Sequence, residues 1–457
     1  MTMTPAAAPP GPNPVLSLAG IARHGFLGQT GRMWREHGDT FELRLGIGSL
    51  VMAIHPDDVR EVSLTQRRSF DKRRSYDGAR KYLVGDGLVA STGELWRRQR
   101  KLMAPLFTPR GIQHYAQTFL EDAHRLEERW DGLAASGEVV EMGAEMMELT
   151  ASIIVRTMFG TAAAADIGRL KQHVETMIRY TTRRMGPHLP DWVPTPAGRA
   201  YRVARDEVHG YLEGIIAQRQ AVPTPDVTVP TGSPHVPDLL DRLMAARDDE
   251  GRPMSAKLLR DESITVFFAG HETTARTLAA TWAALAANPE VAARLHAELD
   301  DVLGDRPPTV EDLRRLPYTL QVIKEVLRLY PAAPFYVRDA VGPARVGGYE
   351  VAEGTPVMLS PYYTHRHPDF WEDPERFDPD RFTPAAEAAR HPQAYHPFAT
   401  GERVCIGNHF ALLESHLLLA VLARRFAPAL VGGPPRWAME GVLVPVGGLP
   451  MRVLARH

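Results

Sequence analysis

Apolar residues recur at helical spacing over most of the chain. The stretches QTFLEDAHRLEERWDGL (117–133) and GAEMMELTASIIVRTMFG (143–160) place apolar side chains three or four positions apart, which predicts two amphipathic helices. Residues 255–287 are apolar on most faces, so this segment is expected to be a buried helix. Further helices are predicted over 317–330 and over NHFALLESHLLLAVLARRF (408–426).

Patterns typical of strands are short and few. FELRLGIGSLVMAIH (41–55) alternates enough to predict two strands joined at its glycines. Short strands are also expected within 344–360 and 442–453, while 366–385, rich in Pro, Asp and Arg, is expected to be coil. Residues 220–238 carry many Pro and Thr residues and are expected to form a surface loop. The predicted fold class is mainly α with minor β.

Composition indicates a globular protein and excludes several classes. Of 457 residues, 44% are hydrophobic and 24% are charged, and the net charge of −2 favours neither nucleic-acid binding nor a basic membrane-surface role. A single cysteine excludes a disulfide scaffold and fits a reducing compartment.

The beginning of the chain has no signal-peptide pattern, and no apolar run approaches the ~18 residues that a bilayer span needs. We therefore expect a cytoplasmic protein without a membrane span. Its expected organisation is a proline-rich N-terminal lead, 1–30, followed by a single domain, 31–457.

The only cysteine, Cys405, stands in the segment FATGERVCIG. A thiolate that binds a metal needs a tight loop and a nearby positive field. Gly401 and Gly407 allow the tight turn, and the helix start that follows favours ionised sulfur. Phe398 can cover the sulfur, and Arg403 can pair with a cofactor carboxylate. An isolated cysteine is more often a small buried hydrophobe, so the inference depends on the whole pattern.

The pattern F-x-x-G-x-R-x-C-x-G resembles the haem-binding loop of the cytochrome P450 family. The resemblance implies that Cys405 is the axial ligand of iron protoporphyrin IX (haem b). It also implies the family's mainly helical fold, with haem between the long helix 255–287 and the helix that follows the cysteine loop. One departure is Ala399, where the family frequently has a second glycine, and because Gly401 and Gly407 remain we expect it to be tolerated.

The long helix contains AGHETT, which is similar to the family's A/G-G-x-D/E-T-T/S motif. The resemblance implies that Thr273 and Glu272 deliver protons in catalysis and that Ala269 and Gly270 lie against the cofactor. His271 occupies the variable position and is expected to support the site or to face outward. A lone Thr-Thr pair would bond back to its own helix about as often.

Two further motifs resemble the family's contacts to the haem carboxylates. Trp96 and Arg100 form W-x-x-x-R, and Arg338 stands in PFYVRDA. An ordinary amphipathic helix also explains the first motif. The apolar neighbours implied to line the substrate pocket are Phe267, Phe268, Ala333, Pro334, Phe335 and Val337.

A structural network is implied by KEVLRLYP, which carries Glu325 and Arg328. At i, i+3 the two side chains share a helix face, but such pairs are also common on exposed helices. A buried pair requires a further partner. The match to the family's PERF-like segment is Arg376 in DPERFDPDRF, so the three residues are expected to hold the coil that supports the cysteine loop.

Together these motifs imply a bacterial, soluble haem-thiolate monooxygenase, nearer the fatty-acid hydroxylase and microsomal-like branch than the camphor-hydroxylase branch. Domain 31–457 would be catalytic and would hydroxylate or epoxidise an apolar small molecule with one oxygen atom of dioxygen. A separate ferredoxin or flavodoxin-type donor with its reductase would supply the electrons. It would dock on the cysteine side through Arg97, Arg98 and Arg110, unless these arginines are only a solvated face. A monomer is expected.

Two alternatives differ in chemistry. A peroxide-using relative would typically lack the acid–Thr pair, which this chain has. A haem-thiolate sensor or carrier would need the cysteine loop but neither a proton relay nor an apolar pocket. The substrate remains open among fatty acids, terpenoids, carotenoids and polyketide cores, because the variable stretches 72–92 and 176–195 carry no readable motif.

Overall fold

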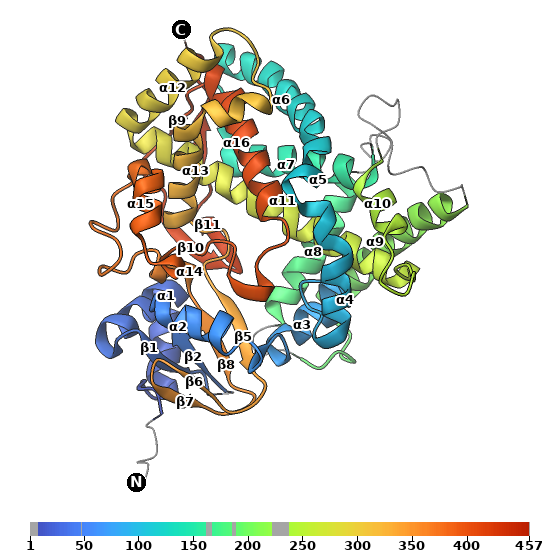
Figure 1. The fold of residues 1–457 in the computed structure, drawn as a ribbon, viewed down its shortest axis with the longest axis vertical. Coiled ribbons are helices and arrows are strands. Elements are labelled where there is room, and N and C mark those ends of the chain that lie inside the picture. The colour runs from blue at the N-terminus through green and yellow to red at the C-terminus, as the bar shows by residue number, and fades with distance from the viewer. Residues whose placement is uncertain (1–7, 47, 161–166, 185–188, 222–236, 457) are drawn as a thin grey trace.

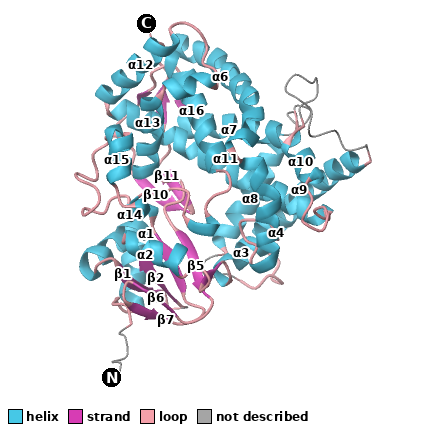
Figure 2. Ribbon diagram, viewed as in Figure 1, coloured by secondary structure: helices cyan, strands magenta, loops and turns pink. Residues whose placement is uncertain are grey.

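Helices form most of the molecule, and the largest sheet lies toward the end that carries the N-terminus (Figures 1 and 2). The computed structural model describes residues 8–46, 48–160, 167–184, 189–221 and 237–456. The longer helices are α1 (Pro14–His37), α4 (Gly93–Met103), α6 (Ala116–Ser136), α7 (Met142–Phe159), α8 (Ile167–Arg183), α9 (Pro196–Gln220), α10 (Leu239–Ala245), α11 (Ala256–Ala287), α12 (Pro289–Leu303), α13 (Pro317–Leu329) and α16 (Asn408–Arg425). The shorter ones are α2 (Pro56–Arg60), α3 (Asp77–Ala79), α5 (Pro109–Ile112), α14 (Pro361–Thr364) and α15 (Pro384–Ala389).

The main sheet has the strand order β1-β2-β8-β5-β3, and it joins strands from both ends of the chain. Strand β2 runs parallel to β8, and the other neighbours in this sheet are antiparallel. The bounds are β1 (Thr40–Arg44), β2 (Ser49–Ala53), β3 (Phe70–Asp71), β5 (Tyr336–Ala340) and β8 (Pro356–Leu359). Smaller sheets pair β6 (Ala344–Val346) with β7 (Tyr349–Val351), β10 (Trp437–Glu440) with β11 (Val442–Pro445), and β12 (Pro450–Arg452) with both β4 (Val139–Glu141) and β9 (Ala429–Leu430).

The predicted fold class is confirmed, and the predicted helices correspond to α6, α7, α11, α13 and α16. The two strands expected within 41–55 are β1 and β2, in antiparallel register. Of the predicted loop 220–238, residues 222–236 lie outside the described residues. Among the described helices, none combines the length and the apolar character that crossing a bilayer requires.

Helix α11 runs through the middle of the molecule and packs against α7, α13 and α16 (Figure 1). Its polar side chains are compatible with burial because they bond to their own helix. The hydroxyls of Ser263, Thr265 and Thr281 each donate to the carbonyl four residues earlier, at 2.8 Å. A buried hydroxyl with such a partner avoids most of the desolvation cost, so a 32-residue helix can cross the core while carrying polar residues.

Within the predicted N-terminal lead, the chain is helical from Pro14 onward, as the first part of α1. Proline is compatible with the first turn of a helix, and Asn13 caps α1 by accepting the Leu16 N–H at 3.0 Å. The helix then docks on the rest of the molecule, where the Thr30 and Tyr363 hydroxyls lie 2.8 Å apart in a buried hydrogen bond. The proline-rich composition therefore marked a helix start.

Glu325 and Arg328 of α13 form a completely buried ion pair, with 0% of either side chain exposed. Arg328 donates to Glu325 through Nε at 2.6 Å and Nη2 at 2.8 Å. It also donates to the carbonyls of His365, Pro374 and Arg376 at 2.6–2.9 Å. The pair therefore binds the coil that follows α14 to α13.

The third arginine of this network is Arg381, which corrects the expectation for Arg376. The Arg376 side chain is 65% exposed and lies 3.4 Å from Asp378. Arg376 contributes only its backbone carbonyl, which accepts from Arg328, because its side chain points toward solvent. Arg381 instead is 13% exposed and places Nε 3.6 Å from Glu325 Oε1. DPERFDPDRF contains two arginines five residues apart, and side-chain direction distinguishes them.

Replacing Glu325 with Ala is expected to lower the free energy of unfolding by about 3–5 kcal/mol, because Arg328 is left buried without its counter-charge. Arg381→Ala should cost about 1–3 kcal/mol, because the buried Glu325 carboxylate loses a nearby positive charge and the Asp373 carbonyl loses a hydrogen bond. Arg376→Ala, the matched control, should change stability by less than ~0.5 kcal/mol. Urea unfolding of the purified variants measures all three, and equal losses for the two arginines would contradict the corrected network.

Candidate active site

A cavity of about 340 Å³ lies between α11 and the loop that carries Cys405. Its walls come from many separate parts of the chain, among them the segment after β3, α4, α7, α10, α11, α13, β5 with the residues before it, the cysteine loop and the start of α16. Most of the lining is apolar. Its apolar side chains include Leu88, Val89, Met103, Phe107, Ile154, Leu239, Val266, Leu327, Ala332, Ala333 and Phe410.

The cysteine loop turns tightly and presents the sulfur to the cavity. Gly401 has a φ of +75°, and a Cβ there would lie 2.2 Å from the carbonyl oxygen of Ser63. The Cys405 N–H donates to the Phe398 carbonyl at 2.9 Å, which closes the loop just before α16 begins at Asn408. The accessible surface of the thiol faces the cavity, although the residue lies in the interior.

Burial raises the pKa of the Cys405 thiol. Three groups act in the opposite direction: a hydrogen bond from the Gly407 N–H and the charges of Arg100 and Lys72. The sulfur is therefore kept as a neutral thiol chiefly by desolvation. A bound metal ion would deprotonate it, and these groups would then stabilise the thiolate.

Four cations line one rim of the cavity: Lys72, Arg100, Arg338 and Arg403. Desolvation holds the pKa of Lys72 well below its usual value, and the charges of Arg338 and Arg403 lower it further. Burial likewise lowers the pKa of Arg403 to about 10, with Asp71 opposing the shift. The Arg403 guanidinium also lies 3.7 Å from the centre of the Trp96 ring. The sequence motifs predicted Arg100, Arg338 and Arg403 but not Lys72, which lies in a stretch without a recognisable motif.

These residues fit the haem that the motifs imply. A thiol lies on one wall, a helix with small residues on another, and buried cations gather at one rim. Within the described residues, Arg100 has no acidic partner, so its burial is uncompensated in the protein alone. Carboxylates of a bound group would neutralise this rim, which gives the cluster a physical reason.

The distal face of the cavity comes from α11, where Ala269, Gly270 and Thr273 line it. The Thr273 hydroxyl donates to the Ala269 carbonyl at 2.7 Å. Gly270 is also required by packing, because a Cβ there would lie 2.9 Å from Ile154 Cδ1 of α7. Glu272 is not among the lining residues, and its carboxylate is 3.3 Å from Arg276 Nη2, one turn along α11.

His271 is buried, so of the two alternatives expected for it, supporting the site or facing outward, the second is wrong. Its Nδ1 lies 2.7 Å from the Phe267 carbonyl, and its ring stacks on the Phe267 ring at 4.6 Å. The Thr150 hydroxyl of α7 donates to the His271 carbonyl at 2.9 Å. Only 1% of His271 is exposed, so the variable position of the motif is buried in this chain.

Of the six apolar pocket residues predicted, Ala333 lines the cavity. Phe267 lies under His271, and Phe335 packs on Phe26 with ring centres 5.3 Å apart. Phe268, Pro334 and Val337 are also outside the lining. The absence of Val337 from the lining follows from the alternation of side chains along β5. Tyr336 and Arg338 face the cavity, and Val337 between them faces away.

The three arginines proposed for docking differ in availability. Arg98 donates through Nε to Asp248 at 2.6 Å and through Nη2 to two carbonyls, so it bridges α4 to the segment before α11. Arg97 pairs with Glu94 on the same helix, while its side chain is largely exposed. Arg110 is exposed in the first turn of α5. Arg98 is therefore committed to the fold.

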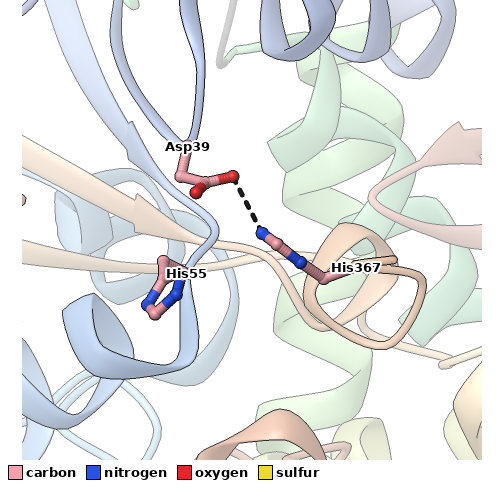
Figure 3. Close-up of side chains that lie close together, drawn as sticks. All are labelled: Asp39, His55 and His367. Atoms are coloured by element: carbon pink, nitrogen blue, oxygen red, sulfur yellow. Dashed lines mark hydrogen bonds and ion pairs between the residues drawn. The ribbon is translucent and has the colours of Figure 1, made fainter. Parts of the chain in front are cut away.

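A second cluster, Asp39, His55 and His367, brings possible metal ligands within 4.8 Å of one another (Figure 3). His367 Nδ1 accepts the Asp369 N–H at 3.2 Å, and His55 Nδ1 accepts the Asp57 N–H at 3.1 Å. Both rings therefore carry their proton on Nε2, and His367 Nε2 donates to Asp39 at 3.1 Å. A histidine that binds a metal through one ring nitrogen usually donates a hydrogen bond from the other, whereas here Nδ1 of each ring accepts one. We therefore interpret the cluster as a structural hydrogen-bonded group and not as a metal site.

Comparisons with known proteins agree with this geometry. The family model described as Cytochrome P450 matches residues 8–446. The chain is 33% identical to pentalenene oxygenase of Streptomyces avermitilis, over 84% of this chain and 83% of the relative. It is 33% identical to cyclooctat-9-en-7-ol 5-monooxygenase of Streptomyces melanosporofaciens, over 93% and 92%. The solved haem domain of cytochrome P450DA superposes with a TM-score of 0.89 at 28% identity, covering 99% of this chain and 98% of that one.

Ala399, in the cysteine loop, has an unfavourable backbone conformation for an L-residue. It has a φ of +58°, in the left-handed region that costs an L-residue roughly 1–2 kcal/mol. Ala399→Gly should therefore raise the free energy of unfolding by about 1 kcal/mol after the entropy cost of glycine is included. The control Ala394→Gly, at a buried position with ordinary geometry, should lower it. Thermal unfolding of the haem-loaded proteins decides, and a destabilised Ala399→Gly would contradict the strain.

Proposed function

The chain belongs to the cytochrome P450 family and is a haem-thiolate monooxygenase, and on that premise we propose which residues carry the reaction and what class of substrate it takes. The observation that carries the proposal is the shared cavity. The Cys405 sulfur, the Thr273 face of α11 and the four-cation rim all border one apolar space. A sensor or carrier would need the sulfur and the rim, but not a hydroxyl and an acid on the facing helix.

The cofactor is proposed to be haem b, with Cys405 as its axial ligand. Lys72, Arg100, Arg338 and Arg403 would hold its carboxylates, with Trp96 supporting Arg403. Bound haem supplies the activation of dioxygen, so that one oxygen atom enters the substrate and the other leaves as water with two electrons and two protons. The apolar lining excludes bulk water, which makes a defined proton path necessary.

Thr273 and Glu272 are proposed to provide that path. The Thr273 hydroxyl bonds to the Ala269 carbonyl in the resting geometry, and rotation of its side chain would turn the proton toward the cavity. Glu272 lies on the outer side of α11, held by Arg276, where it can exchange protons with solvent. The acid would recharge the hydroxyl, and the hydroxyl would deliver the proton at Oγ1.

The substrate class is proposed to be terpenoid, one of the four classes that the sequence leaves open. Two relatives are named for pentalenene and for cyclooctat-9-en-7-ol, an alkene and an unsaturated alcohol by their names. The cavity lining includes Leu88, Val89, Leu239 and Val266, side chains suited to a hydrocarbon skeleton.

Electrons are proposed to come from a ferredoxin or flavodoxin-type protein with its reductase, docking on the cysteine side. Arg97 and Arg110 are available there, whereas Arg98 is held by Asp248. We also propose a cytoplasmic monomer, and one catalytic domain, 31–457, to which α1 adds its packed helix.

Thr273→Ala should keep the red-shifted Soret band of the reduced protein with carbon monoxide, because the Cys405 ligand is untouched. Product formed per electron consumed should fall by about tenfold or more, and free hydrogen peroxide should rise, because proton delivery is impaired. Thr281→Ala is the matched control: its hydroxyl is buried and back-bonded in the same helix but outside the cavity lining. Product, peroxide and reductant are counted in one reaction. Equal coupling in wild type and Thr273→Ala would show that the path avoids this residue.

Cyclic terpene hydrocarbons such as pentalenene are expected to shift the oxidised haem toward high spin at lower concentration than laurate does. The reason is that most of the cavity lining is apolar, and the cations that border it would be occupied by the haem carboxylates. Optical titration of the purified protein with both compounds measures this. Tighter binding of laurate would replace the terpenoid proposal with a fatty-acid one.

A further inference from the structure

The loop between residues 84 and 90 approaches α11 at a distance that only glycine permits. Gly85 has a φ of +55°, and a Cβ there would lie 2.4 Å from Asp261 Oδ2. A Cβ at Gly87 would lie 1.9 Å from Thr265 Oγ1. Both distances are far inside van der Waals contact. Glycine at these two positions therefore brings the backbone of the loop directly onto the helix.

Glu262 of α11 joins this loop to two helices. Its side chain is fully buried, with 0% exposed. Oε2 accepts the Leu88 N–H at 3.0 Å, and Oε1 accepts from Gln99 Nε2 of α4 at 2.7 Å. The Gln99 amide also donates to the Asp86 carbonyl at 2.6 Å. One carboxyl group thus connects α11, α4 and the loop.

A carboxyl group at this position is expensive. Within the described residues Glu262 has no cationic hydrogen-bond partner, whereas adjacent Asp261 is held by Lys257 and Arg260. Burial raises the pKa of Glu262 to about 8. An apolar side chain of similar volume would fill the space at lower cost. What the carboxyl adds is a pair of directed acceptors, one of them for a backbone N–H of the loop.

That loop forms a wall of the cavity. Leu88 and Val89 line it, as do Thr265 and Val266 on the part of α11 that the loop covers. We propose that Glu262 is a positioning residue for substrate binding: by accepting the Leu88 N–H it fixes Leu88 and Val89 as the wall against which an apolar ligand rests, and so selects ligands by shape. The inference rests on the proposed haem site but not on the terpenoid class.

Two ligands of different size test the wall without knowledge of the natural substrate. Imidazole reaches the iron alone, whereas 4-phenylimidazole also presses its phenyl ring against the surrounding walls. Glu262→Gln places an amide NH2 opposite either the Gln99 amide or the Leu88 N–H, so one contact is lost. We expect the dissociation constant of 4-phenylimidazole to change about threefold to tenfold, as for one lost hydrogen bond, while that of imidazole stays within twofold.

Glu145→Gln is the matched control for general destabilisation. Glu145 is also buried, accepts from Trp130 Nε1 at 3.1 Å and pairs with Arg129, and it lies outside the cavity lining. Its replacement should leave the ratio of the two dissociation constants unchanged. Gly87→Ala serves as a second route, because it would push the loop away from Thr265 and leave Glu262 intact. It should change the same ratio.

The pH profile gives a readout that a purely structural residue would not move. Ionised Glu262 accepts both N–H groups, so 4-phenylimidazole affinity in wild type should change through about pH 8 relative to imidazole, and Glu262→Gln should show no such step. Asp86, Asp261 and Lys257 face the same junction and are present in both proteins, so the difference isolates Glu262. Folding raises the pKa of Glu262 from 4.5 to about 8, so between these values the folded protein keeps a proton that the unfolded chain loses. The free energy of unfolding therefore falls as the pH rises from about 4.5 to 8.

Three results would overturn the inference. They are an unchanged ligand ratio in both Glu262→Gln and Gly87→Ala, an equal change in Glu145→Gln, or a pH step that survives in Glu262→Gln. A wild type that binds neither imidazole nor carbon monoxide at haem would instead refute the proposed haem site.

Discussion

The position of the Cys405 sulfur depends on the buried pair Glu325–Arg328. Arg328 holds the coil after α14 through three carbonyls, and His365 in that coil accepts the His396 N–H at 2.8 Å. Two residues later the Phe398 carbonyl accepts the N–H of Cys405. Each step fixes the next, from an ion pair in α13 to the loop. Such a pair adds little net stability, but it specifies one geometry because any displacement leaves a bare charge.

The cations at the cavity rim, unlike the Glu325–Arg328 pair, are buried at a cost in folding free energy. Lys72, Arg100, Arg338 and Arg403 lie around one rim, and burial lowers the pKa of three of them. Their arrangement opposes folding until an anionic group neutralises it. The charges of the Glu325–Arg328 network are thus neutralised within the protein, whereas those of the cation rim are neutralised only when an anionic group is bound. The free energy of binding that group would offset the cost of burying the cations.

Sequence reasoning succeeded where one pattern specifies one geometry. Long runs with helical period predicted α6, α7 and α11, because burial demands that period. Side-chain direction was less accessible. Arg376 and Arg381 stand five residues apart in one coil, and only the backbone path decides which points inward. Lys72 carried no motif at all, because a cation can reach a carboxylate from many chain positions.

The misplaced pocket residues have a similar cause. A helix rotates by about 100° per residue, so Val266 lines the cavity while Phe267 stacks on His271 outside it. Hydrophobicity names candidates for burial without saying which cavity or core receives them. The N-terminal helix was not predicted for a different reason, since Pro14 begins a helix whose docking partner, Tyr363, is more than 300 residues away.

The strand register has a consequence for how the protein is made. Val51 of β2 pairs with Val357 of β8, so the N-terminal strands have their parallel neighbour only after most of the chain has been synthesised. Until the ribosome has released that segment, the β1–β2 hairpin keeps one open edge with unpaired backbone groups. Helical parts such as α6 and α7 can condense earlier from local contacts. The main sheet therefore closes late, and until then β1 and β2 are exposed to aggregation and proteolysis.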